Sequence, residues 1–385
     1  MIYLDNNATT AVVPEVFAAM RPFLEGFYGN PSSAYSFSLG VKATVETARE
    51  AVAALLGAAP NEIVFTSGGT ESDNWAILGT LEASPGKRHI VTTRVEHEAV
   101  RKLCQKLETK GYAVTWLDVD EIGALDLDQV RESLRDDTAL VSVMMANNET
   151  GVLFPVAEIA EIVKEKSDAV FHVDGVNAVG KIPIDLKNTK VDLFSISAHK
   201  FHGPKGVGVL CIRDGLNLPA IQIGGGQENK RRAGTEAVHQ IAGIGAAAKY
   251  VSDLSPMERT QQLRDKLENA ILKTIPNSSV NGTRDPRLRL PNTTNISFEN
   301  TNGEMIMSRL DDEGICVSTG SACHAADNSA SPVLEAMNIP YSRSMGSIRF
   351  SLGRQNTEAE IDRVVEVLPS IVSGLRRLAG SANRG

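Results

Sequence analysis

Short apolar runs alternate with amphipathic segments between residues 62 and 212, and this alternation limits the chain to few folds. The runs favour strands, whereas the segments between them carry apolar residues at helical spacing. Strands that alternate with helices form a mostly parallel sheet with helices on both faces. We predict strands at residues 62–65, 89–92, 113–117, 139–145, 169–173, 191–196 and 207–212.

Polar clusters follow the carboxyl ends of several of these predicted strands. In a parallel sheet these ends lie along one edge, and ligands bind beyond them. Each cluster alone is a weak signal, but their common position relative to the strands predicts one binding site. The clusters lie at residues 66–70, 97, 147–148, 174 and 197–200.

The pattern changes after about residue 255, where strands and helices no longer alternate regularly. A chain of 385 residues is long enough for two hydrophobic cores. We therefore predict a large domain of residues 15–255 and a small α+β domain formed by residues 1–14 and 256–385.

Composition and charge argue against several classes of function. The net charge of −8 argues against general binding to nucleic acid or to anionic membranes. We see no apolar run of the ~20 residues that a membrane-spanning helix needs, and no signal peptide. The four cysteines lack the spacing of a zinc site, so we expect no metal, and we expect reduced thiols in the cytoplasm.

Lys200 lies in a polar segment between two predicted strands, at 191–196 and 207–212. A lysine there must be solvated, paired or used covalently, because burying an unpaired ammonium is costly. Its side chain could simply extend to solvent. Alternatively, it could bind pyridoxal 5'-phosphate (PLP) covalently, which requires a phosphate site, an acid for the pyridine nitrogen and a group over the ring.

A small, glycine-rich turn joins a predicted strand to a predicted helix at residues 66–74. Backbone N–H groups at such a turn can bind a phosphate together with the helix dipole. A plain turn capped by Thr70 would explain the same residues. The basic loop at residues 224–235 also has two interpretations, a solvated loop or a loop that faces an anion.

Taken together, these segments resemble the PLP-dependent cysteine desulfurases, a group of the class V aminotransferases with fold-type I architecture. The resemblance spans nearly the whole chain and rests on many motifs in the same order. It implies an α/β fold, in which a large domain with a mostly parallel seven-stranded sheet is joined to a smaller α+β domain. The motifs are Tyr3–Thr10, Gly29–Ser33, Thr66–Ser72, Glu96-His97, Asn147–Gly151, His172–Asp174, Ser197–Lys200, Arg232–Thr235, Ser321–Cys323 and Ile348–Arg354.

The resemblance assigns the cofactor contacts residue by residue. Lys200 is expected to bind PLP covalently and then to transfer protons at the substrate. Asp174 is expected to pair with the pyridine nitrogen, and His97 to stack on the ring and to serve as an acid or base. The phosphate contacts that it implies are Gly69, Thr70, Ser197 and His199, with Thr235 from the second subunit of a homodimer.

Three further positions concern the ring oxygen and the substrate. Asn177 stands where many relatives carry a glutamine bonded to the phenolic oxygen of the cofactor, and its side chain is one methylene shorter. The resemblance implies that Asn148 contacts both cofactor and substrate. It also implies that Arg349 binds the carboxylate of L-cysteine as a bidentate fork.

Cys323 is the nucleophile that the resemblance implies. A thiolate on an exposed loop can attack the sulfur of L-cysteine, which leaves L-alanine and a persulfide on Cys323. The expected acceptor of this sulfur is a protein such as an iron–sulfur scaffold. We predict that Cys104, Cys211 and Cys316 are buried and inert, because each lies in an apolar helix or strand.

Three other interpretations are open on the sequence. Tyr35, His324 and the segment Ser331–Leu334 resemble selenocysteine lyases, which release selenide from L-selenocysteine with the same fold and cofactor. A PLP-dependent aminotransferase would not need Cys323. A non-catalytic persulfide carrier or scaffold partner would not need the PLP contacts.

Overall fold

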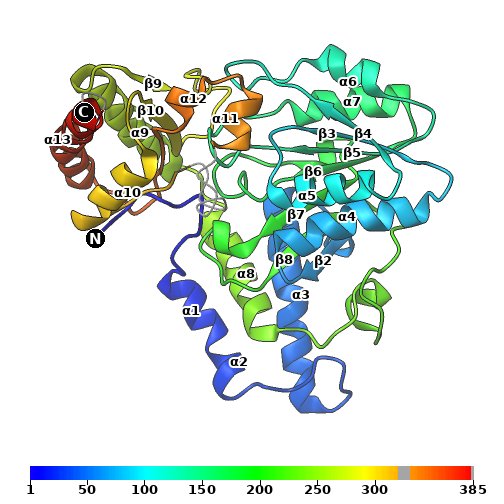
Figure 1. Cartoon of the computed structure of the whole chain (residues 1–385). Helices are drawn as coiled ribbons and strands as arrows, with labels where there is room; N and C mark the ends of the chain where they lie inside the picture. The colour runs from blue at the N-terminus through cyan, green and yellow to red at the C-terminus, as the bar shows by residue number, and fades with distance from the viewer. Residues whose placement is uncertain (320–329, 383–385) are drawn as a thin grey trace.

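The computed structural model describes residues 1–319 and 330–382 and is built around two separate hydrophobic cores (Figure 1). The larger core packs on one face of a seven-stranded sheet, and the smaller core packs against a three-stranded sheet. The first residues of the chain and the C-terminal helix both belong to the smaller core. The N-terminal segment therefore passes from one core to the other.

The large sheet has the strand order β2-β8-β7-β6-β5-β3-β4. Among the described strands of this sheet, only β8 runs in the opposite direction, since it is antiparallel to both of its neighbours. The predicted mostly parallel seven-stranded sheet is thereby confirmed. Its strands are β2 (Ile63–Thr66), β3 (His89–Thr93), β4 (Ala113–Leu117), β5 (Thr138–Met144), β6 (Val170–Asp174), β7 (Leu193–Ser197) and β8 (Gly208–Ile212).

Helices cover both faces of this sheet, because successive side chains of each strand point to opposite faces. Leu140 of β5 joins the core beneath α4 and α5, whereas Val141 joins the core beneath α3, α7 and α8. Both faces are thus buried, as expected for a parallel sheet. The helices are α1 (Pro14–Met20), α2 (Pro22–Glu25), α3 (Ser36–Leu56), α4 (Gly69–Ala83), α5 (Glu98–Glu108), α6 (Leu127–Ser133), α7 (Val156–Lys166) and α8 (Val238–Val251).

The smaller core lies between an antiparallel sheet of order β12-β10-β9 and three helices. A short parallel pair, β1 with β11, joins the N-terminus to this region. The predicted domain boundary near residue 255 falls between α8 and α9 and stays a prediction. The elements are β1 (Ile2–Tyr3), α9 (Pro256–Thr274), β9 (Ser278–Val280), β10 (Thr293–Phe298), α10 (Gly303–Asp312), β11 (Ile315–Cys316), α11 (Pro332–Ala336), α12 (Tyr341–Ser344), β12 (Ser347–Ser351) and α13 (Glu358–Ala382).

Two helix boundaries depend on a proline and a glycine. The first helix, α1, ends before Pro22, which has no N–H to continue it and begins α2 instead. The helix predicted from Trp75 begins at Gly69, six residues earlier. Its N-cap is Gly68 rather than Thr70, so the interpretation of a turn capped by Thr70 is wrong. The first turn of α4 is thereby brought to the end of β2.

The basic loop at residues 224–235 is held in place by its own charges. Glu228 accepts two hydrogen bonds from the buried guanidinium of Arg49, at 2.8 and 2.9 Å. Arg231 donates to the backbone oxygens of Asn61 and Ile63, and Arg232 pairs with Glu71 in α4 at 2.9 Å. The interpretation of a freely solvated loop is therefore wrong for these side chains.

A search of the described helices for one long and apolar enough to cross a membrane finds none.

Candidate active site

The carboxyl ends of the parallel strands open into a cavity of about 170 Å³. It brings together most of the residues that the sequence predicted for cofactor and substrate. Thr235 and Arg349 are described but are not among its lining residues, and Cys323 lies outside the described residues. The lining residues are Gly69, Thr70, Asp73, His97, Met144, Ala146, Asn148, Asp174, Val176, Asn177, Ser197, His199 and Lys200.

A larger groove of about 670 Å³ lies between α5 and α11. Its charges lie at the surface, and some of them pair with each other, as Arg94 does with Asp118 at 2.6 Å. Buried carboxyl groups, in contrast, gather at the smaller cavity. Buried groups with perturbed pKa values mark functional sites more reliably than volume, so we assign the chemistry to the smaller cavity.

The N-terminus of α4 forms one end of this cavity. Gly68 has φ +152°, a backbone conformation that residues other than glycine rarely adopt. It connects β2 to the start of α4. A Cβ on Gly69 would lie 2.7 Å from Cγ2 of Val176, so a larger residue would intrude on the lining. The first N–H groups of a helix have no partner within it, and those of α4 lie with the hydroxyls of Thr70 and Ser197 in the lining, which suits a phosphate.

His199 belongs to the same end of the cavity and is neutral. Its Nδ1 lies 3.2 Å from the hydroxyl of Thr9. Burial lowers the pKa of His199 to about 4, and the charges of Lys200 and Lys205 add to this effect. A neutral imidazole can donate one hydrogen bond to an anion without adding charge.

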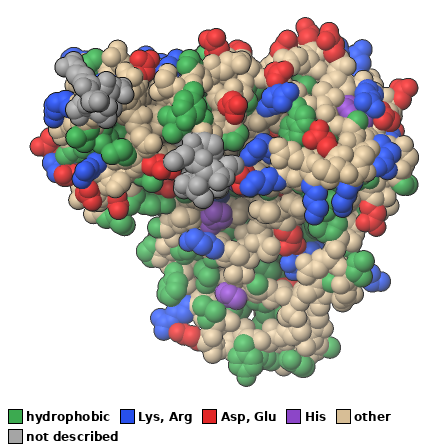
Figure 2. Space-filling view, in the orientation of Figure 1, with side chains coloured by type: hydrophobic (Ala, Val, Ile, Leu, Met, Phe, Trp, Pro, Cys, Tyr) green, Lys and Arg blue, Asp and Glu red, His purple; other side chains and the backbone are tan. Residues whose placement is uncertain are grey.

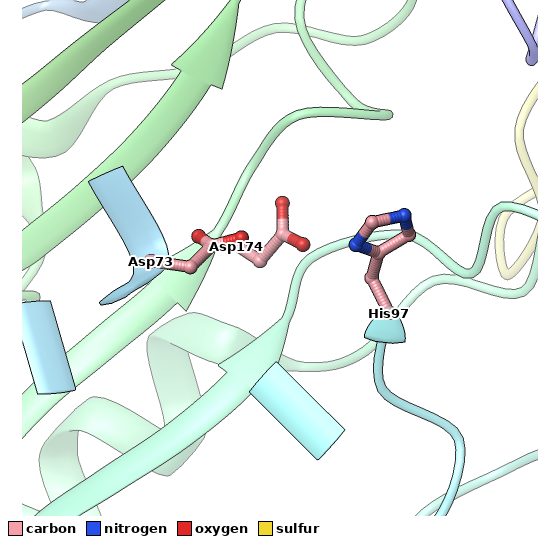
Figure 3. A group of neighbouring side chains, drawn as sticks. All are labelled: Asp73, His97 and Asp174. Carbon is pink, nitrogen blue, oxygen red and sulfur yellow. The ribbon is translucent and has the colours of Figure 1, made fainter. Parts of the chain in front are cut away.

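Two buried carboxyl groups and a histidine meet in the same cavity (Figure 3). Asp174 ends β6, Asp73 lies one turn into α4, and His97 is the N-cap of α5, with their ligand atoms within 4.8 Å of one another. Figure 3 shows the Asp174 side chain between the other two. Asp174 accepts a hydrogen bond from the N–H of Val176 at 2.9 Å.

The two carboxyl groups do not share the same charge state. Burial, and then the nearby Asp174 carboxylate, raise the pKa of Asp73 well above its usual value. Burial also raises the pKa of Asp174, but the nearby His97 and Lys200 oppose that rise. Two like charges this close in a buried site are unfavourable, so Asp73 holds a proton more readily and Asp174 is the better carrier of negative charge.

Asp73 was missed by the sequence analysis, although helical spacing could have found it. Residues three or four apart share one face of a helix, which places Asp73 beside Gly69 and Thr70. That argument requires the helix to begin at Gly69, whereas the sequence pattern placed its start at Trp75. Behind Asp73, the neutral His172 bonds to the hydroxyls of two serines at 2.9 Å each.

His97 is oriented by the helix that it caps. Its Nδ1 accepts a hydrogen bond from the N–H of Ala99 at 3.2 Å, so the neutral ring carries its proton on Nε2. Burial lowers the pKa of His97, and Asp174 opposes this effect. The ring is therefore a fixed group that can hold a proton at Nε2.

The N-terminal segment reaches across to Lys200. Lys200 ends a short turn after β7, and its Nζ donates to the backbone oxygens of Asn7 and Ala8. Thr10 adds a second link, since its hydroxyl donates to the backbone oxygen of His199 at 2.8 Å. Residues from the smaller core thus help to place the predicted cofactor lysine.

Asn148 and Arg349 lie next to each other at the edge of the cavity. The Nη1 atom of Arg349 donates to the backbone oxygen of Asn148 at 3.0 Å, and Nη2 pairs with Asp5 at 2.7 Å. Its Nε is buried and has no hydrogen-bond partner among the described residues. Asn147 shapes this corner, since its side-chain oxygen accepts the N–H groups of Glu149 and Thr150.

The described cysteines differ in exposure. Cys104 and Cys211 are buried, and burial raises the pKa of each thiol to about 12, which makes both unreactive. Cys316 is partly exposed, so the prediction that it is buried is wrong. It belongs to β11, whose pairing with β1 is only two residues long and leaves part of the strand uncovered.

Comparison with known proteins agrees with the motifs. The model of the family described as aminotransferase class-V matches residues 2–364. The chain belongs to the aminotransferase class-V family. The predicted fold class and the predicted family are thereby confirmed.

Within this family, the chain is similar to proteins named cysteine desulfurase. It is 53% identical to "Cysteine desulfurase" of Trichormus azollae, with 100% of this chain and 96% of the relative covered. It is 49% identical to "Cysteine desulfurase NifS" of Azotobacter vinelandii, with 98% and 94% covered. A solved structure titled "NIFS-LIKE PROTEIN" matches with a TM-score of 0.91 at 39% identity, with 97% of this chain and 100% of the other covered.

Glu96 should make the stability of this class V protein depend on pH. Its Oε1 accepts hydrogen bonds from Thr93 and from the N–H of Met144, and burial raises its pKa from 4.5 to about 8. A carboxyl group whose pKa is raised by folding stabilises the fold below its unfolded pKa, and this contribution is lost as pH rises through about 8. Glu96→Gln should therefore lose less stability between pH 5 and pH 8 than the parent.

Urea unfolding of the cofactor-free protein at both pH values would measure this difference. The expected reduction is of the order of a few kcal/mol, because each unit of pKa shift corresponds to about 1.4 kcal/mol. Glu121→Gln, at an exposed loop position, should leave the difference between the two pH values as in the parent. The same pH dependence in Glu96→Gln and in the parent would contradict this account.

Proposed function

We propose that this class V protein is a PLP-dependent cysteine desulfurase, a sulfurtransferase that takes sulfur from L-cysteine. The supporting observation is the cavity itself, which joins a helix N-terminus, a buried carboxylate and a lysine at one edge of the sheet. In addition, the chain of this protein is 53% identical over its whole length to a protein named cysteine desulfurase. The products would be L-alanine and a persulfide on Cys323.

The cavity residues fit PLP at each of its polar groups. The α4 N-terminus with Thr70, Ser197 and His199 suits the dianionic phosphate, which needs N–H and O–H donors. Asp174 is a buried carboxylate without a cationic side chain among its described hydrogen-bond partners, which suits a protonated pyridine nitrogen. When bound, PLP supplies an electron sink that stabilises negative charge at the substrate's α-carbon.

The chain's own residues then place the substrate and move protons. Asp174 keeps the pyridine nitrogen protonated, and the neutral Asp73 adds no second charge beside it. Lys200 would move a proton at the α-carbon of the bound substrate. His97 holds a proton at Nε2 on the opposite side of Asp174 from Asp73.

Substrate binding is proposed for the corner beside the cavity. Arg349 has a buried Nε with no described partner, so its guanidinium retains a donor for a carboxylate. Asn148 lines the cavity on the same side. A carboxylate bound there would compete with Asp5 for the guanidinium, because Asp5 holds Nη2 at 2.7 Å.

Sulfur transfer is proposed for Cys323. Its thiolate attacks the sulfur of the bound cysteine, a new S–S bond forms and the carbon–sulfur bond breaks. Protonation of the carbon completes L-alanine, and Cys323 keeps the sulfur as a persulfide. A protein acceptor, such as an iron–sulfur scaffold, would then take this sulfur.

The selenocysteine lyase interpretation is not favoured, because the relatives that share about half of the sequence are named cysteine desulfurase. The aminotransferase and carrier interpretations are not favoured for the same reason. We further propose a cytoplasmic location, since the described cysteines are free and a persulfide-forming thiol needs a reducing compartment.

We also propose that two copies assemble. Large apolar side chains are exposed on α1, α2 and the start of α3, and Figure 2 shows apolar side chains gathered on this lower part of the molecule. An exposed apolar patch of this kind marks a protein interface. The side chains that form the patch are Phe17, Leu24, Phe27, Tyr28, Tyr35, Phe37 and Leu39.

Thr235 is proposed to complete the phosphate site of the second copy. Thr235 is exposed and does not line the cavity of its own subunit. The neighbouring Arg232 binds Glu71 in α4, which holds this loop against the helix that faces the phosphate. The position is therefore fixed and accessible to a partner.

Cys323→Ser should separate cofactor chemistry from sulfur transfer. The variant should bind PLP and should change its absorbance when L-cysteine is added, because the cavity residues are unchanged. It should lose at least about a hundredfold in L-alanine production, since a hydroxyl is a far weaker nucleophile than a thiolate. Mass spectrometry of the parent after brief exposure to L-cysteine should find the added sulfur on Cys323.

Cys104→Ser is the matched control for this variant, because Cys104 is buried and its thiol has a raised pKa. It should keep turnover in its folded fraction. Full cysteine desulfurase activity in Cys323→Ser would show that Cys323 is not the nucleophile.

Phe17→Arg combined with Leu39→Arg should convert the protein to monomers, because it places charge in the exposed apolar patch. Sedimentation should show half the mass of the parent, whereas Ile122→Arg, at an exposed loop position outside the patch, should remain dimeric.

Thr235→Ala should stay dimeric but retain PLP less well. A parent protein that is active as a monomer would rule out the shared site.

A further inference from the structure

Lys181 is a second buried lysine beside the active site, and the proposed reaction gives it no role. It lies in the turn after β6, and only 8% of its surface is exposed. Its ammonium donates to Oδ1 of Asn177 at 2.7 Å, to the backbone oxygen of Asn177 at 2.9 Å and to Oδ1 of Asn7 at 3.1 Å. Three donors thus meet three acceptors, which is the full capacity of a charged lysine.

These contacts occur in a place that is unfavourable for a cation. Burial lowers the pKa of Lys181 well below its usual value, and the positive charges of Lys200 and Arg349 lower it further. All three oxygens that accept its hydrogen bonds are uncharged amide oxygens. A lysine buried at such a position needs these hydrogen bonds, because an ammonium without them would be costly to bury.

The contact with Asn177 determines which way that side-chain amide faces. An asparagine amide can be turned over without a change of shape, so its orientation depends on its partners. A charged lysine can only donate, and Nδ2 of Asn177 already donates to the backbone oxygen of Asn147, so the atom of Asn177 next to Lys181 is Oδ1. Its Nδ2 therefore lies on the opposite side, where one of its two hydrogens bonds to the backbone oxygen of Asn147 at 3.2 Å.

Asn177 lines the cavity, so the orientation of its amide matters for what binds there. An N–H of Nδ2 can donate to an anionic oxygen, whereas Oδ1 in the same place would repel one. PLP carries such an oxygen, the phenolic oxygen on its ring.

We propose that Lys181 is a positioning residue that holds Asn177 with its N–H side towards the phenolic oxygen of bound PLP. This proposal rests on the proposed function, since it takes PLP as the ligand of the cavity. Lys181 acts through Asn177 and does not itself touch the cofactor. The short spacing of the two residues allows this contact, because both lie in the single turn that follows Asp174.

A second path from Lys181 to the site runs through Asn7. The side chain of Asn7 accepts from Lys181, and its backbone oxygen accepts from Lys200. Loss of Lys181 could therefore disturb Lys200 as well as Asn177. The experiment has to separate these two paths.

A double-mutant cycle on the PLP-loaded protein makes this separation. Lys181→Met keeps the length of the side chain and removes its donors. PLP release into a trapping protein should become about tenfold faster than in the parent, the loss expected for one hydrogen bond to a charged group. The absorbance band of the bound cofactor should shift too, since its ring oxygen loses a donor.

In an Asn177→Ala background, Lys181→Met should cause no further change in release rate or in the absorbance band. Two residues that act through one contact are non-additive in this way. Lys164→Met is the matched control: Lys164 is partly buried and bonded to Ala169 and Asp192, but it does not line the cavity. It should leave the release rate and the spectrum of the parent unchanged.

Asn177→Asp covers the case in which Lys181→Met does not fold. Its carboxylate keeps the partner of Lys181 and the shape of the side chain but has no N–H to donate. It should release PLP at least as fast as Lys181→Met is expected to. Additive effects in the cycle, or a parent-like release rate in Asn177→Asp, would overturn the proposal for Lys181. A parent protein that binds no PLP would instead overturn the proposed function.

Discussion

The parallel direction of β2, β3, β5, β6 and β7 is the constraint on which the site depends. Parallel strands deliver their carboxyl ends to one edge of a sheet, and each of these strands is followed there by polar residues. The apolar strands bury both faces of the sheet, so the edge is the place where polar side chains meet. The cavity is a consequence of strand direction more than of any single residue.

Charge is distributed unevenly within this cavity. Two buried carboxyl groups, Asp73 and Asp174, line the cavity together with the N-terminus of α4. Such a site favours a ligand that carries both a positive group and an anion. PLP with a protonated ring nitrogen and a phosphate has this distribution of charge, which connects the electrostatics of the site to the proposed chemistry.

The N-terminal segment connects this site to the smaller core. Asn7 contacts both buried lysines, Lys181 through its side chain and Lys200 through its backbone. The preceding Asp5 holds Arg349, which belongs to the three-stranded sheet. A movement of the smaller core would therefore shift both the proposed cofactor lysine, Lys200, and the proposed carboxylate site at Arg349.

The sequence was sufficient to predict the strands of the large sheet, because a strand buried on both faces appears in the sequence as a short run of apolar residues. It also placed the polar clusters correctly, since strand ends are visible as changes of composition. It missed Asp73, because the start of α4 depends on a glycine conformation and not on periodicity. It could not find the contact of Lys181 with Asn7 or that of Asp5 with Arg349, because these join residues that are brought together only by the fold.

Borohydride reduction of the PLP-loaded protein, followed by peptide mass spectrometry, tests the central claim most directly. Our account predicts a yellow protein in which reduction links the cofactor irreversibly to Lys200. It also predicts that Lys181, the other lysine buried at the site, stays unlabelled because its three donors are engaged by Asn7 and Asn177. A label on Lys181 or on another lysine, or a protein that takes up no PLP, would contradict the account.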